Sequence, residues 1–101
     1  MIENRQAERR PAFALTEVRH GEHKPLTGLI YNISQDGAFI LTNTTPPVAE
    51  CVSIRMPYIK ENNKVVWIHG KVTHRNYVGF GLMFESLDED ICRIVRTVSA
   101  V

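Results

Sequence analysis

Apolar side chains alternate with polar residues or glycine along much of this chain, and short clusters of turn-forming residues interrupt the alternation. A period of two places the apolar side chains on one face of a strand, as in an antiparallel sheet half exposed to water. Six such segments are expected, at residues 12–19, 26–34, 37–41, 52–56, 65–75 and 77–84. Short strands joined by turns rich in Gly, Pro, Asn and Asp predict a mainly β fold, an antiparallel barrel or sandwich.

Two glycines lie in the sixth segment. Gly79 and Gly81 alternate with Phe80 and Leu82, on the side away from the apolar face. A glycine weakens a strand, and it is retained where a backbone or a ligand approaches closely, or where a barrel bends. Gly79 and Gly81 are therefore possible ligand contacts on the outer face, with a bend of the barrel as an equally good explanation.

The spacing of apolar residues changes after residue 85. Ser86 and Glu89 are spaced as a capping box, the pattern that begins a helix. Apolar residues then recur at helical spacing, namely Leu87, Ile91, Ile94, Val95 and Val98. Acidic residues come first and arginines later, an order that suits the helix dipole. The sequence predicts a short amphipathic C-terminal α-helix of about three turns, packed against the strands.

Length, charge and cysteine content restrict the class of protein. The chain has 101 residues, enough for one domain with one core. A net charge of +1 gives no reason to expect binding to nucleic acid polymers or to an anionic membrane. Residues 1–10 lack the apolar segment of a secretory signal, and no apolar run is long enough to span a membrane. Two cysteines fit a reducing compartment, so we expect a cytoplasmic protein.

The N-terminal residues differ from the rest in composition. Residues 1–11 are polar, contain Arg5, Arg9 and Arg10, and have no hydrophobic face to anchor them. Pro11 favours an extended conformation of the residue before it. We predict a flexible arginine-rich arm at residues 1–11, followed by a single domain at residues 12–101.

The hexapeptide Asn32-Ile33-Ser34-Gln35-Asp36-Gly37 lies between two predicted strands. Asp36-Gly37 is explained as a turn, because glycine tolerates positive φ. Asn32 and Ser34 are two apart on a strand, so their side chains are expected on the same, outer side. The core side would then carry Leu29, Tyr31 and Ile33. Two polar side chains presented beside a turn suggest a binding site.

Catalytic and metal sites find little support. His20 and His23 lie close in sequence, but no cysteine, third histidine or carboxylate set stands at ligand spacing, so no metal is expected. His69 and His74 are an odd number of residues apart and should point to opposite faces of one strand. No Ser/His/Asp or Cys/His arrangement is recognised in the sequence. We expect a protein that is not an enzyme and that needs no cofactor.

Taken together, the two polar motifs resemble those of the PilZ domain family. The family's R-x-x-x-R motif reads Arg5-Gln6-Ala7-Glu8-Arg9 here, and its [D/N]-x-S-x-x-G motif is the hexapeptide. Residues 79–84 are similar to the family's glycine-containing last strand, and the predicted helix also fits. The resemblance covers the whole chain. It implies a six-stranded antiparallel β-barrel with a C-terminal helix that binds cyclic di-GMP, a bacterial second messenger.

The resemblance implies a role for each motif residue. The ligand carries two guanines and two phosphates, and arginine binds both a guanine edge and a phosphate by paired hydrogen bonds. The implied contacts are Arg5, Arg9, Arg10, Asn32, Ser34 and Gly37. In this scheme the arginines bind the nucleotide, the two polar side chains read a guanine edge, and the glycine permits the turn. Asn32 stands where the motif also allows Asp, so it lacks a charge that would attract guanine N–H groups.

The mode of action also follows from the resemblance. The arm would fold over the bound nucleotide, and the changed surface would signal through an unidentified effector protein. One alternative is a PilZ-type adaptor that binds proteins without nucleotide, although such an adaptor would lack the arginines. A barrel for single-stranded nucleic acid would need a basic groove and several exposed aromatic residues, whereas Trp67 alone is expected to face outward.

Overall fold

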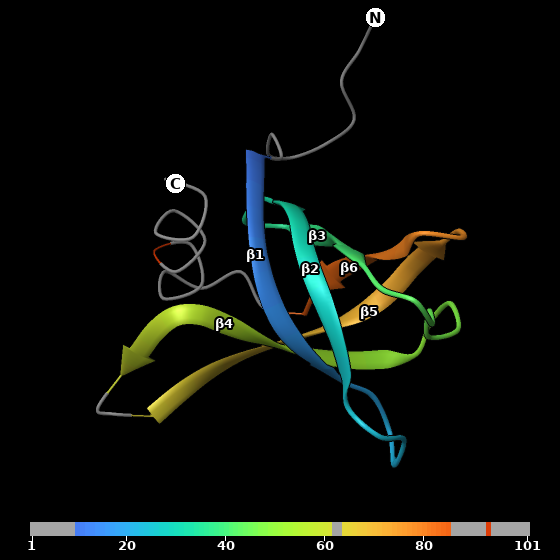
Figure 1. The fold of residues 1–101 in the computed structure, drawn as a ribbon, viewed down its shortest axis with the longest axis horizontal. Helices are drawn as coiled ribbons and strands as arrows, with labels where there is room; N and C mark the ends of the chain where they lie inside the picture. Colours follow the sequence, from blue (N-terminus) through green and yellow to red (C-terminus); the bar gives the residue numbers. More distant parts are fainter. Residues whose placement is uncertain (1–9, 62–63, 86–92, 94–101) are drawn as a thin grey trace, which may run out of the picture.

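The computed structural model describes residues 10–61, 64–85 and 93, and it describes the side chains of residues 11–56, 65–85 and 93. Across these residues the chain forms six strands, shown in Figure 1. They are β1 (Arg10–Arg19), β2 (Leu26–Ile33), β3 (Gly37–Leu41), β4 (Cys51–Glu61), β5 (Lys64–Arg75) and β6 (Gly79–Phe84). The strands close a barrel in the order β1-β2-β3-β6-β5-β4. The predicted six-stranded antiparallel barrel is confirmed.

The strand boundaries follow the alternation closely, and β4 departs most. It runs from Cys51 to Glu61, well beyond the predicted end at residue 56. The extra length pairs with β5 as far as Glu61 and Lys64. Figure 1 shows β4 and β5 continuing together as a ribbon that extends past the other strands. β1 begins at Arg10, so the predicted boundary at residue 12 lies two residues too late.

Aliphatic and aromatic side chains from all six strands fill the interior of the barrel. The buried cluster consists of Ala12, Val18, Ile30, Ile33, Ala38, Ile40, Val52, Ile54, Met56, Ile68, Val72, Phe80, Leu82 and Phe84. Removal of this apolar surface from water is the main term that stabilises a small barrel. The predicted apolar face is buried at Ile68 and Val72 in β5 and at Phe80, Leu82 and Phe84 in β6, whereas Val78 is exposed and the alternation of β5 ends after Val72.

A β-bulge interrupts the first hairpin near the beginning of β1. Ala12 and Phe13 of β1 together lie opposite Tyr31 of β2. Tyr31 also has no opposite residue in β3, because Ile30 and Asn32 pair with consecutive residues there. An inserted residue reverses the inward and outward sides of the strand beyond it. The bulge therefore decides which residues of the hexapeptide reach the surface.

The closing contact between β1 and β4 is short. Its backbone register comprises Val18 opposite Ile54 and Arg19 opposite Ser53. The hydroxyl of buried Thr16 donates a hydrogen bond to the carbonyl O of Arg55 over 2.6 Å, which extends the contact between the two strands.

The predicted C-terminal helix falls within residues 86–101, which lie outside the described residues except for position 93. The helix therefore stays a prediction. In the part of the chain that the structure describes, no helix has the length and apolar character needed to cross a membrane.

Candidate functional site

The N-terminal residues enter the barrel directly beside the hexapeptide. Arg10, the first residue of β1, lies opposite Ile33, and Pro11 lies opposite Asn32. Proline lacks an N–H group and is tolerated at the first positions of a strand. The side chain of Arg10 and the whole of Arg5 and Arg9 lie outside the described residues. The backbone places the start of β1, which the R-x-x-x-R segment precedes in the sequence, beside the hexapeptide.

Asn32 belongs to a row of residues that crosses four strands on the outer face. The row runs from Asn32 in β2 to Phe39 in β3, Gly81 in β6 and His74 in β5. The rings of Phe39 and His74 stack with their centroids 5.7 Å apart. The prediction that Asn32 faces outward is consistent with its partial exposure.

The side chain of Asn32 has an unsatisfied acceptor. Its Oδ1 atom is buried and accepts no hydrogen bond from the described residues. A buried polar atom without a partner costs free energy, of the order of 1–3 kcal/mol. A hydrogen-bond donor from residues 1–9 or from a ligand would remove this cost, and β1, which follows residues 1–9 in the sequence, pairs with β2 at Asn32.

Ser34 is not displayed on the outer face as predicted. It is 4% exposed, and its hydroxyl closes the turn between β2 and β3. The Oγ atom accepts a hydrogen bond from the N–H of Asp36 over 3.1 Å and donates to the carbonyl O of Gly37 over 3.5 Å. The prediction was wrong because the turn itself uses the serine, as Ser side chains commonly do. Ser34 thus positions the turn beside Asn32.

Gly37 is required for a different reason from the predicted one. Positive φ occurs among the described residues at Phe13, Ala49 and Gly21, so the turn at Gly37 does not need it. A Cβ atom at Gly37 would instead collide with the carbonyl O of Leu82 in β6. The glycine allows β3 and β6 to approach closely at this end of the barrel.

The alternation of apolar residues predicted the wrong direction, inward or outward, for some side chains of β2. Tyr31 was predicted in the core, yet it is 46% exposed, and Leu29 is half-buried. Ile30 occupies the core together with Ile33, because the bulge at Tyr31 shifts the strand by one residue. The sequence did contain a signal of this shift: strict alternation would place the apolar side chain of Ile30 in water.

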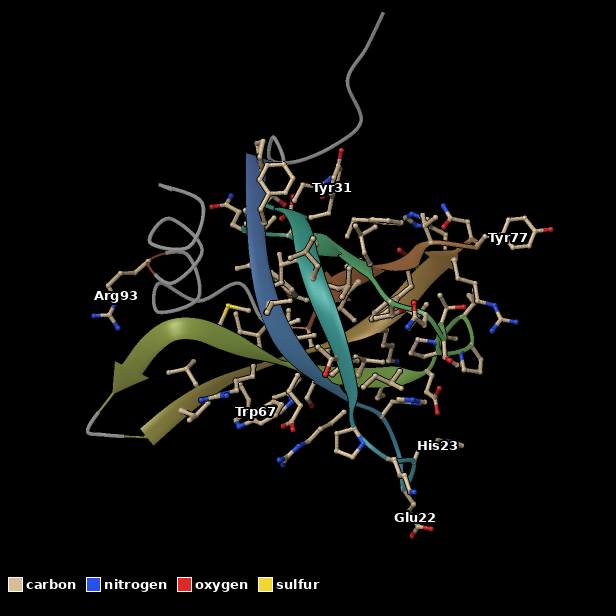
Figure 2. The ribbon with its side chains drawn as sticks, viewed as in Figure 1. Glu22, His23, Tyr31, Trp67, Tyr77 and Arg93 are labelled. Carbon is tan, nitrogen blue, oxygen red and sulfur yellow. The ribbon has the colours of Figure 1, made fainter. Side chains whose placement is uncertain are left out.

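The bulge also creates an exposed aromatic pair that the sequence did not predict. Phe13 is 61% exposed, has a φ of 50°, and lies edge-on against Tyr31 with ring centroids 5.4 Å apart. Positive φ is uncommon for a bulky residue and signals local strain. Figure 2 shows Tyr31 at the end of the barrel where β1 begins. Two flat apolar surfaces therefore lie beside the entry point of the N-terminal residues.

The glycines of β6 pack against protein atoms. A Cβ atom at Gly79 would collide with the carbonyl O of Ile40, and one at Gly81 would collide with the ring of His74. Gly79 pairs with Leu41, at the end of β3 remote from Gly37. Close packing thus explains both glycines, and the sites proposed for ligand contact there are covered by β3 and by His74.

His69 and His74 do not point to opposite faces as predicted. Both are exposed, because a register shift between Val72 and His74 changes the phase of β5. They have different neighbours. His74 stacks on Phe39, whereas His69 Nδ1 lies 2.5 Å from the hydroxyl of Ser53.

Comparison with known proteins gives a consistent picture. The PilZ domain matches residues 3–99 of the chain. The crystal structure of the PilZ domain of CeSA from a cellulose-synthesizing bacterium is similar, with a TM-score of 0.66 and 16% identity, over 90% of this chain and 94% of that one. The PlzA protein of Borreliella burgdorferi, solved in complex with c-di-GMP, has a TM-score of 0.70 and 14% identity. That match covers 95% of this chain and 41% of the PlzA chain.

The comparison with curated proteins gives no match. At 14% and 16% identity, the two solved structures establish the fold alone. The family match is broader, because it spans nearly the whole sequence and includes both the R-x-x-x-R segment and the Asn32–Gly37 turn. On this evidence the chain belongs to the PilZ domain family.

Proposed function

We propose that this protein is a bacterial cytoplasmic receptor for cyclic di-GMP, with no catalytic step. The observation that supports the proposal is the pairing of Arg10 with Ile33, because β1 begins beside the Asn32–Gly37 turn and the other arginines precede Arg10 by only a few residues. Arg5 lies five residues before Arg10, a reach of at most about 18 Å of extended chain. The similar structure of the PlzA protein, which was solved in complex with c-di-GMP, supports this choice of ligand.

The site residues have distinct chemical roles in this proposal. Arg5 and Arg9 bind guanine edges and phosphates, for which the planar guanidinium fork is suited. Arg10 stacks on a guanine plane. Asn32 Oδ1, which accepts no hydrogen bond from the described residues, receives one from a guanine N–H group. The ligand thereby satisfies an acceptor that the barrel leaves without a donor.

Four further residues contribute to the proposed site, two by holding the turn and two by offering rings on which a guanine stacks. Ser34 and Gly37 hold the turn through a hydrogen bond and a close strand contact, and so they place Asn32 correctly. Phe13 and Tyr31 offer exposed rings at the entry point of the arm. Stacking of a guanine on such a ring stabilises the complex by about 1–3 kcal/mol per base.

Binding would order the arm over the nucleotide and change the surface that a partner protein recognises. The ordering costs conformational entropy, which is offset by the arginine contacts. NMR of residues 1–10 tests this step, because their amide signals should shift and lose fast motion on addition of cyclic di-GMP. Equal mobility of these residues with saturating ligand contradicts the switch.

The binding step is tested by calorimetry with cyclic di-GMP, with GMP and a short oligonucleotide as control ligands. Arg9→Ala, Asn32→Ala and Ser34→Ala should each weaken binding at least tenfold, whereas Arg19→Ala should not. Arg19 is the matched control because it lies at the opposite end of β1, where its guanidinium stacks 4.4 Å from the ring centroid of Trp67. Unchanged affinity in both Arg9→Ala and Ser34→Ala removes the assignment. A folded wild-type protein that binds none of the nucleotides favours the adaptor alternative.

A further inference from the structure

Three potential metal ligands come together at the opposite end of the β1–β2 hairpin from the arginine-rich arm. His20 directly follows β1, His23 lies in the turn before β2, and Glu50 directly precedes β4. Figure 2 shows His23 and Tyr31 at opposite ends of the barrel. The ten residues of β1 separate the two ends by roughly 30 Å. This cluster is therefore distinct from the proposed nucleotide site.

The fold brings a carboxylate that is distant in the sequence, that of Glu50, next to the two histidines. The Nδ1 atom of His20 lies 3.3 Å from Oε2 of Glu50. The imidazole rings of His20 and His23 stack with centroids 4.7 Å apart and an interplanar angle of 20°. One ligand atom from each of the three residues lies within 4.8 Å of the other two.

Two atoms of the cluster are buried and have no hydrogen-bond partner among the described residues. His20 is 8% exposed, and its Nδ1 atom makes no hydrogen bond with any described residue. Oε2 of Glu50 is also buried and accepts no hydrogen bond from the described residues, so the 3.3 Å contact between the two atoms lacks hydrogen-bond geometry. An imidazole nitrogen and a carboxylate oxygen that face each other in this way form a donor set for a cation.

The backbone holds the three residues in place. Gly21, with a φ of 55°, allows the chain to turn, and the N–H of His23 donates to the carbonyl O of His20 over 3.2 Å. On the other side, the N–H of Val72 donates to the carbonyl O of Glu50 over 3.0 Å, which fixes Glu50 against β5. The ligands thus come from two separate connections, each fastened by main-chain hydrogen bonds.

We propose that His20, His23 and Glu50 form a binding site for a divalent transition-metal ion of the Zn²⁺ class. Two imidazoles and a carboxylate are a known ligand set for zinc, with water in the fourth position. Imidazole nitrogen also favours Zn²⁺, Cu²⁺ or Ni²⁺ over Mg²⁺ and Ca²⁺, which prefer oxygen ligands.

Binding requires a small contraction of the cluster. Ligands at about 2.1 Å from a tetrahedral ion lie roughly 3.4 Å from one another. The widest separation, at most 4.8 Å, would have to shorten by about 1.4 Å. His23 is exposed, so rotation of its side chain can supply this movement without disturbing the core. The ion would then fasten the β1–β2 turn to the loop that precedes β4.

Calorimetric titration of the untagged, metal-free protein with ZnCl₂ tests the proposal. The wild-type protein should bind one Zn²⁺ per chain, and MgCl₂ should give no binding. His23→Gln and Glu50→Gln should each weaken Zn²⁺ binding at least tenfold. His23 is preferred to His20 for substitution because its exposed side chain makes loss of folding improbable as the cause. The midpoint of thermal unfolding should also rise with Zn²⁺ concentration in the wild type, and less in the two variants.

Two control variants separate this site from other zinc ligands. Glu22→Gln removes a carboxylate from the same exposed turn, and Cys51→Ser removes an exposed thiol near His20. Neither substitution should change the affinity by more than twofold. The proposal is overturned by the absence of stoichiometric Zn²⁺ binding, or by wild-type affinity in His23→Gln and Glu50→Gln. Loss of binding only in Cys51→Ser also overturns it, since the thiol would then be the ligand.

Discussion

The backbone of Gly37 in β3 lies against the carbonyl O of Leu82 in β6 so closely that a methyl group cannot be accommodated there. Gly81 is also closely covered, but by the ring of His74, which is an exposed side chain. A carbonyl within a paired strand moves only with the sheet, whereas a side chain can rotate away. The two glycines should therefore tolerate substitution to different degrees.

We expect Gly37→Ala to lower the free energy of unfolding by about 3 kcal/mol and Gly81→Ala by about 1 kcal/mol. Urea denaturation followed by tryptophan fluorescence measures both values. In Gly81→Ala the His74 ring should also leave Phe39, which NMR shifts of the two rings would report. Equal costs at the two positions would mean that the strands at Gly37 move apart as easily as a side chain rotates.

Because Phe13 has a positive φ, we expect glycine to be more stable than alanine at this position, the reverse of the usual order in a strand. Alanine normally stabilises a strand relative to glycine, by about 0.5–1 kcal/mol. At a φ of 50°, the Cβ atom of alanine is strained, and glycine is not. Both variants lose the contact with Tyr31, so this loss cancels in the comparison. Because only alanine is strained, we expect Phe13→Gly to be more stable than Phe13→Ala by about 1 kcal/mol.

Leu15, exposed on the same strand, provides the comparison pair for Phe13. Leu15 does not have a positive φ, so Leu15→Ala should be more stable than Leu15→Gly. Chemical denaturation of the four variants gives both differences, and the same order at both positions would show that Phe13 carries no strain.

The hydrogen bond from Thr16 to the carbonyl O of Arg55 reinforces the short contact that closes the barrel. Thr16→Val keeps the shape of the side chain but leaves this carbonyl without its donor. We expect a loss of about 1–2 kcal/mol in the free energy of unfolding. Thr27→Val is the control, because Thr27 is exposed and should change stability by no more than about 0.5 kcal/mol.

The identity of residue 32 should tune the proposed affinity for cyclic di-GMP. Asn32→Asp adds a negative charge where a guanine would present its N–H groups, and charge-assisted hydrogen bonds are the stronger kind. We expect Asn32→Asp to bind roughly fivefold more tightly than the wild type, about 1 kcal/mol. Calorimetry gives the ratio directly.

Asn43→Asp makes the same change of net charge at an exposed position in the loop after β3, so it controls for a general electrostatic effect. It should leave the affinity unchanged or slightly reduced. If Asn32→Asp weakens binding as much as Asn32→Ala does, residue 32 does not face a guanine edge.

Much of the fold was predictable because it depends on local patterns. The alternation of apolar residues located all six strands, and β3 agrees with the prediction at both ends. The residues between the strands have turn-forming side chains, and short turns favour antiparallel neighbours. Asn32 is partly exposed, whereas the side chains of Arg5, Arg9 and Arg10 lie outside the described residues, and the binding roles of all four residues stay predictions.

The candidate site was less predictable because register shifts have no simple signature in a single sequence. An extra residue at Tyr31 places Ile30 in the core, and a similar shift before His74 brings that ring onto Phe39. Each shift depends on how a strand pairs with its neighbours on both sides, which is a property of the closed barrel.

By itself, the sequence determined the strand segments, the turns between them and the two motifs that identify the family. Only the tertiary structure decided that Ser34 closes a turn, that Gly37 makes room for Leu82, and that Glu50 meets His20 and His23. The physical reason is the range of the interactions. Side-chain alternation and turn chemistry act over a few residues, whereas strand register and close backbone contacts bring together residues far apart in the chain.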